Sequence, residues 1–434
     1  MPRDTSSGRP LGAGLALLAL TIGLAACGGS ERPSPATASF DLTIGQLVPL
    51  RGDLARFGPS GRKAAELAVD LANRASRGAG ARVRVRLSSA DSETQGLAGL
   101  IAARRQIDHG ASCLNGDWAT ASTLALANQV AAKQGVPMIS PASTNFSIAT
   151  LDDRGYVFRS APSDALQVIA LADLAERSLG GAKGRTISVA ARHDGYGTEI
   201  SRRFAAEWRG RGGRISGPLL YDPTQASFDR EARRIVAGSP SAFAIFDFPE
   251  TYAKLAPALL ATGRFDAARL LTADTLIVDS ASQWGIPDAA LDGARATQPG
   301  AAASGATGRA FADAFASAPG APARPDAFAA QSFDATVLCY LAAVAAGSSS
   351  PAAIRDEIAA VSGPPGRRVG FMQLGEAVRT LRAGRQIDYE GASGPLDLDP
   401  HGDPTAATYD VLAYSGGTPR RSGAVEAGAR RGGR

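Results

Sequence analysis

The sequence contains few of the side chains that bind metals or carry out nucleophilic catalysis. Among its 434 residues are 3 cysteines and 3 histidines, and the histidines at 109, 193 and 401 are far apart in the chain. None of them has the spacing of a metal site. The sequence also lacks a Gly-x-Ser-x-Gly motif and a phosphate-binding loop. We therefore expect no metal site, no cofactor and no enzymatic activity.

Two of the three cysteines lie in apolar segments. Cys113 falls in an expected strand and Cys339 in an expected helix, so two buried, unpaired thiols are the simpler prediction. An extracellular compartment would also permit a disulfide between them, and the sequence alone leaves that question open.

The first 26 residues are typical of a secretory signal peptide. Arg3 and Arg9 precede an apolar run at 11–26 that is too short and too rich in Gly and Ala for a convincing membrane span. The run ends Leu-Ala-Ala-Cys-Gly, which resembles the lipobox of bacterial lipoproteins. That resemblance implies a lipidated Cys27 as the first mature residue, anchored on the outer face of the cell membrane.

Both ends of the mature chain lack an apolar period. Residues 27–38 are rich in Gly, Ser and Pro, and we expect a flexible tether there. Residues 416–434 contain five arginines and one glutamate among Gly, Ala and Ser, and we expect a disordered basic tail. This tail and the signal peptide account for the formal net charge of +5. The part between them is nearly neutral, which gives no reason to expect nucleic acid as a partner.

About 375 residues remain between tether and tail, which favours two domains over a single core. Expected strands alternate with expected helices in two series, the first from residue 40 and the second from residue 164. In the second, helices are expected at 164–178, 198–211, 227–237 and 250–262, with strands at 186–191, 215–221, 242–246 and 269–272. Two such series predict an α/β fold with two doubly wound parallel sheets. Ligands of such sheets bind beyond the carboxyl ends of the strands, here in a cleft between the two.

The stretch 111–144 predicts a strand–helix–strand unit with small hydroxyl residues at both strand ends. The first N–H groups of its helix, together with the helix dipole, could bind a carboxylate, and Thr120 or Ser122 could add a hydroxyl donor. Ser and Thr are also the commonest N-caps of any helix. This unit alone therefore does not distinguish a site from an ordinary helix start.

A series of short motifs identifies a resemblance that covers nearly everything from residue 40 to residue 414. The motifs are Leu47 to Gly52 with Phe57-Gly58, Gly135 to Thr144, Tyr156 to Asp164, Asp194 to Gly197, Phe333 to Ala335, Tyr389 to Pro395 and Gly402-Asp403. In these motifs and their order the chain resembles the type I periplasmic or extracellular solute-binding proteins of ABC importers, in the branched-chain amino acid-binding subgroup.

The resemblance implies two lobes joined by three crossovers, near residues 160, 275 and 405. Lobe 1 would then comprise 39–160 and 276–405, and lobe 2 would comprise 161–275 and 406–415.

The resemblance also implies donors for a ligand carboxylate in lobe 1. The carboxylate-binding hydroxyl falls on Thr120, with Ala121 and Ser122 as alternatives. The backbone and hydroxyl pair after Ser-Pro falls on Ala142 and Thr144.

Further ligand-binding positions fall on both lobes. Two aromatic positions fall on Phe57 and Tyr196, and the acid that would pair with a ligand ammonium falls on Asp274. A second aromatic position of lobe 2 falls on Asp247, or on Phe248 if the loop shifts by one residue. An additional acid at 247 would favour a more polar or cationic ligand.

The implied function is capture of an amino acid-like solute by a lipid-anchored protein that delivers it to the permease subunits of an ABC importer. A lipoprotein on the same fold that senses a ligand or regulates another process is the alternative.

Overall fold

The computed structural model describes residues 38–300, 305–322 and 325–428. The expected signal peptide, Cys27 and nearly all of the expected tether lie outside these ranges.

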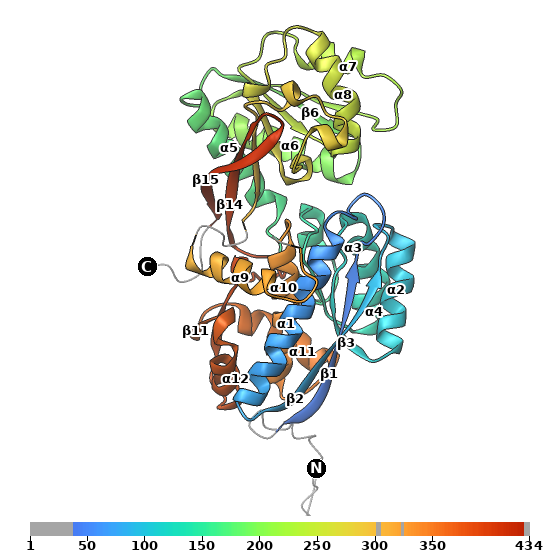
Figure 1. The fold of residues 1–434 in the computed structure, drawn as a ribbon, viewed down its shortest axis with the longest axis vertical. Helices are drawn as coiled ribbons and strands as arrows, with labels where there is room; N and C mark the ends of the chain where they lie inside the picture. The colour runs from blue at the N-terminus through green and yellow to red at the C-terminus, as the bar shows by residue number, and fades with distance from the viewer. Residues whose placement is uncertain (1–37, 301–304, 323–324, 429–434) are drawn as a thin grey trace, which may run out of the picture. The chain divides into compact units, whose positions relative to one another are not determined.

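The first of two large sheets belongs to lobe 1 and is parallel throughout, with strand order β2-β1-β3-β4-β5 (Figure 1). Helices cover both faces, because each crossover helix buries an apolar stripe against the sheet. One face packs against α1, α10 and α11, and the other against α2 and α3. The strands are β1 (Ser39–Val48), β2 (Arg82–Asp91), β3 (Ala111–Asn115), β4 (Met138–Ser140) and β5 (Val157–Arg159).

The helices of lobe 1 come from two separate parts of the chain. From the first part come α1 (Gly58–Gly78), α2 (Gly96–Asp108) and α3 (Thr120–Leu126), which continues through η1 (Ala127–Ala131) into α4 (Ala132–Gln134). From the second come α9 (Ala306–Ala316), α10 (Ala329–Ala346), α11 (Pro351–Ser362) and α12 (Leu374–Arg382), with a small sheet of β11 (Arg367–Gly370), β12 (Ile387–Gly391) and β13 (Gly394–Pro395).

Helix α10 is mostly apolar and is buried on nearly all sides. Within the described ranges it is the one helix long and apolar enough to cross a membrane, and 89% of it is buried inside the protein. It packs under the lobe 1 sheet, so its composition reflects a core helix.

The sheet of lobe 2 has seven strands in the order β15-β14-β10-β9-β8-β6-β7. Helices α5 and α6 cover one face and α7 and α8 the other. The strands are β6 (Thr186–Arg192), β7 (Arg214–Tyr221), β8 (Ala242–Phe246), β9 (Leu270–Ala273), β10 (Arg295–Pro299), β14 (Ala406–Ser415) and β15 (Thr418–Gly428). The helices are α5 (Asp164–Leu179), α6 (Gly195–Gly210), α7 (Asp229–Ile235) and α8 (Pro249–Ala261).

Short 3-10 helices complete the chain. They are η2 (Phe146–Thr150), η3 (Ala267–Arg269), η4 (Asp274–Leu276), η5 (Ser282–Trp284), η6 (Asp288–Ala290) and η7 (Phe371–Gln373). The two large sheets, each with helices on both faces, confirm the predicted α/β fold with two doubly wound lobes.

The second crossover lies later in the chain than predicted. Strand β10 pairs in parallel with β9 and antiparallel with β14, so it belongs to the sheet of lobe 2. The chain therefore returns to lobe 1 after residue 299 and not near 275. Apolar alternation in 295–299 is weak (Arg-Ala-Thr-Gln-Pro), and only pairing with two neighbours makes it a strand.

The predicted disordered tail is wrong as far as residue 428. Strand β15 pairs with β14 along its length, and Val425 and Ala427 pack into the core beside α5. The hairpin turns at Gly416 and Gly417, both with positive φ (55° and 71°), as a tight two-residue turn requires. Buried residues of this strand are mostly small, which leaves little apolar pattern in the sequence.

Cys113 and Cys339 form a disulfide, which corrects the simpler prediction of two free thiols. The bond joins β3 to α10, with the two Cα atoms 6.0 Å apart. The cysteines are 226 residues apart in sequence, so their proximity depends on the packing of α10 under the sheet.

A buried arginine links the segments that pass between the lobes. Arg159, at the end of β5, forms an ion pair with Asp403 just before β14. Its Nη1 also donates to the carbonyl of Asn145 at 2.8 Å. The two crossover segments that contain Arg159 and Asp403 are thereby held together.

Candidate functional site

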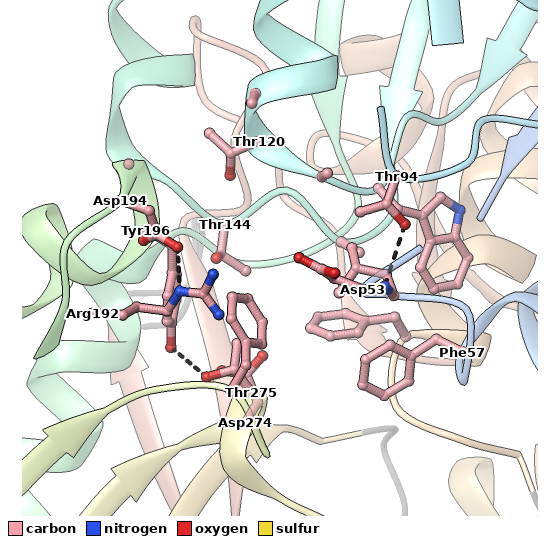
Figure 2. Close-up of a pocket in the computed structure, with 18 of the residues that line it drawn as sticks. Asp53, Phe57, Thr94, Thr120, Thr144, Arg192, Asp194, Tyr196, Asp274 and Thr275 are labelled. Carbon is pink, nitrogen blue, oxygen red and sulfur yellow. Dashed lines mark hydrogen bonds and ion pairs between the residues drawn. The ribbon is translucent and has the colours of Figure 1, made fainter. Parts of the chain in front are cut away.

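A cavity of about 290 Å³ lies between the two lobes, at the carboxyl ends of their strands (Figure 2). Its lobe 1 wall comes from the loops after β1, β2, β3 and β4, and its lobe 2 wall from the segments after β6, β8 and β9. This is the position at which doubly wound sheets bind ligands.

The lobe 1 wall is built on Asp117, which follows β3. The Asp117 carboxylate accepts hydrogen bonds from Ser92 Oγ (2.8 Å), from its neighbour's backbone N–H and from Ser122 Oγ (2.5 Å). Burial raises the pKa of Asp117 to about 6. These bonds fix the loop that leads into α3, whose N-cap Ala119 supplies no side-chain hydrogen bond. Thr120 and Ala121 at the helix start line the cavity, whereas Ser122 is held inside by Asp117.

The loop after β4 supplies Ala142 and Thr144 to the cavity wall. Between them, Ser143 turns inward and donates to the carbonyl of Trp118 at 2.9 Å. The carbonyl of Thr144 accepts from the backbone N–H of Asp164 at the start of α5. The position of Thr144 thus depends on both lobes.

Aromatic rings form the rest of the lobe 1 wall. The ring of Phe328 packs edge-on against Phe57 and Trp118, with centroid distances of 5.9 and 6.4 Å. All three rings line the cavity. They offer a large apolar surface for the body of a ligand.

The lobe 2 wall contains a stacked group of side chains. Tyr196 and Phe248 lie with their centroids 5.8 Å apart, and the guanidinium of Arg192 lies 4.2 Å above the Phe248 ring. The Tyr196 hydroxyl accepts a hydrogen bond from Thr275 at 3.1 Å.

Asp274 begins η4 and lines the cavity. It is 5% exposed, and its Oδ1 accepts a hydrogen bond from Gln167 Nε2 at 2.7 Å. Burial raises the pKa of this carboxyl above its usual value, an effect that Gln167 partly offsets. A bound cation would stabilise the ionised form.

Asp247, one of the predicted ligand-binding positions, does not line the cavity. Its carboxylate accepts hydrogen bonds from the Tyr221 hydroxyl (2.7 Å) and from the backbone N–H of Phe248 (2.8 Å), and burial raises its pKa to about 7. Phe248, the alternative considered from the sequence, faces the cavity instead. The other six predicted positions (Phe57, Thr120, Ala142, Thr144, Tyr196 and Asp274) line it.

Sequence reasoning missed several residues of the cavity wall, chief among them Arg192 and Asp194. Arg192 is the last residue of β6, and a strand end in a doubly wound sheet is where a ligand-facing side chain is expected. That signal was available in the sequence. No such signal marks Phe328, because it lies in the second chain segment of lobe 1 and only the packing of that segment brings it to the cavity.

Comparisons with known proteins identify the family of this chain. The model of a family described as periplasmic binding protein matches residues 41–410. The chain is 26% identical over 390 residues to the chemotactic signal transduction system substrate-binding protein BasB of Halobacterium salinarum, covering 87% of this chain and 86% of BasB.

Solved structures share the fold. The branched-chain amino acid transporter substrate-binding protein LivJ of Streptococcus pneumoniae, in complex with isoleucine, superposes with a TM-score of 0.70 at 17% identity, covering 89% of this chain and all of LivJ. An ABC transporter solute-binding protein of R. palustris, in complex with benzoate, superposes with a TM-score of 0.67 at 18% identity, covering 91% of this chain and 98% of that protein.

Proposed function

The chain belongs to the periplasmic binding protein family, whose members are extracytoplasmic solute-binding proteins, and we propose that it captures an amino acid-like solute by closure of its two lobes. In this proposal it is anchored to the membrane through a lipidated Cys27 and delivers the solute to the permease of an ABC importer.

The division of polar groups across the cavity carries the proposal. Lobe 1 contributes the hydroxyls of Thr120 and Thr144, and lobe 2 contributes the carboxylate of Asp274. A zwitterion enclosed away from water needs donors for its carboxylate and an acceptor for its ammonium. Because the two are on different lobes, only a closed state satisfies both, and the ligand would shift the population toward closure.

The ligands of the structural neighbours support a small organic acid. Isoleucine and benzoate share a carboxylate and an apolar body, and the cavity combines hydroxyl donors with aromatic walls. With Phe248 in the wall and Asp247 outside it, the reason to expect a cationic ligand no longer applies.

A sensor of the same ligand class is the second candidate. BasB is named as a substrate-binding protein of a chemotactic signal transduction system, so this fold also serves signalling. Uptake of a labelled ligand by cells with and without the gene separates the two candidates. Loss of a transport protein reduces import of the ligand, whereas loss of a sensor leaves import unchanged.

A thermal-shift screen against amino acids, their amides and short-chain and aromatic acids tests the proposal. A ligand that binds only the folded state raises the melting temperature, and the rise grows with the ratio of ligand concentration to Kd. Titration calorimetry then measures the affinity of each hit. Failure of every acid in the panel to raise the melting temperature would count against the proposal.

A further inference from the structure

Arg192 is a largely buried cation on the cavity wall that the proposed recognition of a zwitterion does not use. Its side chain is 13% exposed, and it extends from the end of β6 into the cavity (Figure 2). Stacking on Phe248 holds the guanidinium plane in place without occupying its N–H donors.

The ion pair of Arg192 engages one edge of the guanidinium. Its Nε lies 2.5 Å from Asp194 Oδ2, while Asp194 Oδ1 accepts from the Gly197 backbone N–H and caps α6. Figure 2 shows the two terminal nitrogens of Arg192 directed away from Asp194. A guanidinium has five donors in a fork suited to a carboxylate, and a buried charge requires partners for them.

The surrounding charges make Arg192 distinctive. Among the described residues that line the cavity it is the only cation, and Asp53, Asp194 and Asp274 are the acids. The neighbouring Arg56 donates to the Thr275 carbonyl and stacks on Phe57, and it does not line the cavity.

We propose that Arg192 binds a carboxylate of the ligand from the lobe 2 side and selects acids over the corresponding amides. The assignment rests on the proposed function and extends it. Thr120 and Thr144 offer donors from lobe 1, so a ligand carboxylate can be held by both lobes, or a second carboxylate by Arg192 alone. The bidentate geometry makes lysine a poor replacement.

Three acid and amide pairs serve as probes: L-glutamate with L-glutamine, L-leucine with L-leucinamide, and benzoate with benzamide. Calorimetry measures each affinity for the parent and for Arg192→Met, which keeps an apolar contact with Phe248 and removes the charge. We expect the parent to prefer an acid. The variant should lose at least tenfold in affinity for that acid, because removing one partner of a buried charge pair costs more than one factor of ten. Its affinity for L-leucinamide and benzamide, which lack a carboxylate, should change little. L-glutamine keeps its α-carboxylate, so its affinity should stay unchanged only if Arg192 binds the second carboxylate of L-glutamate, and should fall if Arg192 binds the α-carboxylate.

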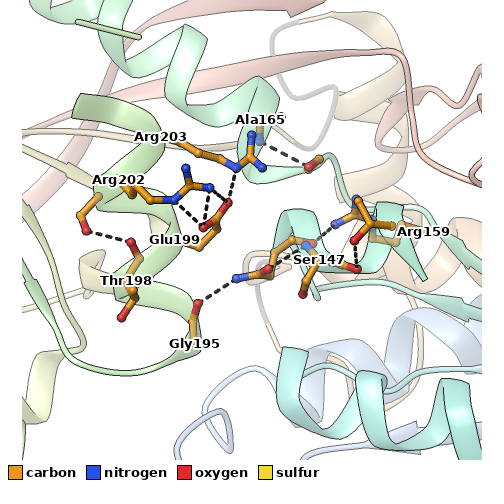
Figure 3. Close-up of polar contacts among 12 residues, drawn as sticks. Ser147, Arg159, Ala165, Gly195, Thr198, Glu199, Arg202 and Arg203 are labelled. Carbon is orange, nitrogen blue, oxygen red and sulfur yellow. Dashed lines mark hydrogen bonds and ion pairs between the residues drawn. The ribbon is translucent and has the colours of Figure 1, made fainter. Parts of the chain in front are cut away.

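Two further variants distinguish ligand binding from a structural ion pair. Asp194→Asn keeps the helix cap, since Asn caps as well as Asp, and frees the guanidinium from its counter-charge. We expect it to bind the acid as tightly as the parent or more tightly. Arg202→Met removes an exposed charge from the same helix region outside this cavity (Figure 3), and we expect unchanged affinity.

The outcomes are separable. If the parent binds an acid and Arg192→Met binds it equally well with the same preference over the amide, this assignment is overturned while the proposed function stands. The assignment is also overturned if Arg192→Met and Asp194→Asn both lower the melting temperature but leave the preference for the acid over the amide unchanged. If Arg192→Met does not fold, the preference for the acid over the amide is measured in Arg192→Lys and Asp194→Asn instead. An unchanged preference in Arg192→Lys would then overturn the assignment. If the parent binds none of the acids, the proposed function fails and this assignment with it.

Discussion

The side-chain amide of Asn145 in lobe 1 donates a 2.8 Å hydrogen bond to the backbone carbonyl of Gly195 in lobe 2 (Figure 3). Beside it, the guanidinium of Arg203 lies 3.5 Å from the ring of Phe146. These contacts join the lobes at the rim of the cavity, and they would be lost if the lobes opened there.

Asn145→Asp should weaken ligand binding through closure. The substitution keeps the acceptor that caps η2 but removes the donor to Gly195. A net hydrogen bond contributes about 0.5–1.5 kcal/mol, so we expect affinity to fall roughly 2- to 10-fold with little change in melting temperature. Calorimetry gives the affinity, and small-angle scattering gives the population of the open form. An unchanged affinity would show that this bond does not contribute to closure.

Asp274→Asn should remove the charge partner of a ligand ammonium. Loss of one partner of a desolvated charge pair costs roughly 2–5 kcal/mol, or about 30- to 4000-fold in affinity. Thr120→Ala should cost less, on the order of 1 kcal/mol, because other donors remain. Asp247→Asn is the matched control, since Asp247 lies outside the cavity. Loss of binding in Asp247→Asn but not in Asp274→Asn would contradict the assignment of the ammonium site to Asp274.

Stability should fall as pH rises from about 4.5 to about 7. Burial, together with the nearby carboxylates of Asp274 and Glu199, raises the pKa of Asp164 to about 7, although Arg159 opposes the shift. In the unfolded chain this carboxyl titrates near pH 4. Between these values the folded state holds a proton that the unfolded state has lost, so deprotonation favours unfolding by on the order of 1–4 kcal/mol. Asp247 acts in the same direction.

Urea unfolding at a series of pH values checks this dependence. Asp164→Asn stays neutral and should flatten the profile in this window, whereas the exposed Asp70→Asn on α1 should not. A parent protein that gains stability from about pH 5 to about pH 7 would contradict the expected sign.

Removal of residues 416–434 should destabilise the protein, contrary to what the composition of that segment suggests. The truncation deletes β15, exposes β14 as an edge strand and uncovers apolar surface beside α5. We expect the melting temperature to fall by several degrees. Removal of 429–434 alone leaves β15 whole and is the control; equal melting temperatures for both truncations would show that β15 contributes nothing.

Lipidation of Cys27 stays a prediction from the Leu-Ala-Ala-Cys-Gly sequence. Mass spectrometry of protein extracted from membranes of the native host should find the acyl mass on Cys27 as the first residue. Replacement by Ser should release the protein from the membrane, since the acyl chains supply the anchor. An unmodified chain that begins at another residue would refute the prediction.

The sequence by itself determined the alternation of strands and helices and the presence of small hydroxyl residues, Thr120 and Thr144 among them, after two neighbouring strands. These features depend on neighbours within a few residues: apolar periods set the elements, and the positions after a strand in a doubly wound sheet face the ligand. The position of Arg192 at the end of β6 could have been predicted by the same argument from strand ends.

Only the tertiary structure decided which of Asp247 and Phe248 faces the cavity. Successive side chains after a strand point in opposite directions, so an error of one residue exchanges a buried acid for an aromatic wall. Contacts between segments far apart in the sequence decided three further features. The disulfide of Cys113 with Cys339, the arrival of Phe328 at the cavity and the place of β10 in the second sheet each join segments far apart in the chain. Local periodicity carries no information about such contacts, because their free energy comes from packing that exists only in the folded protein.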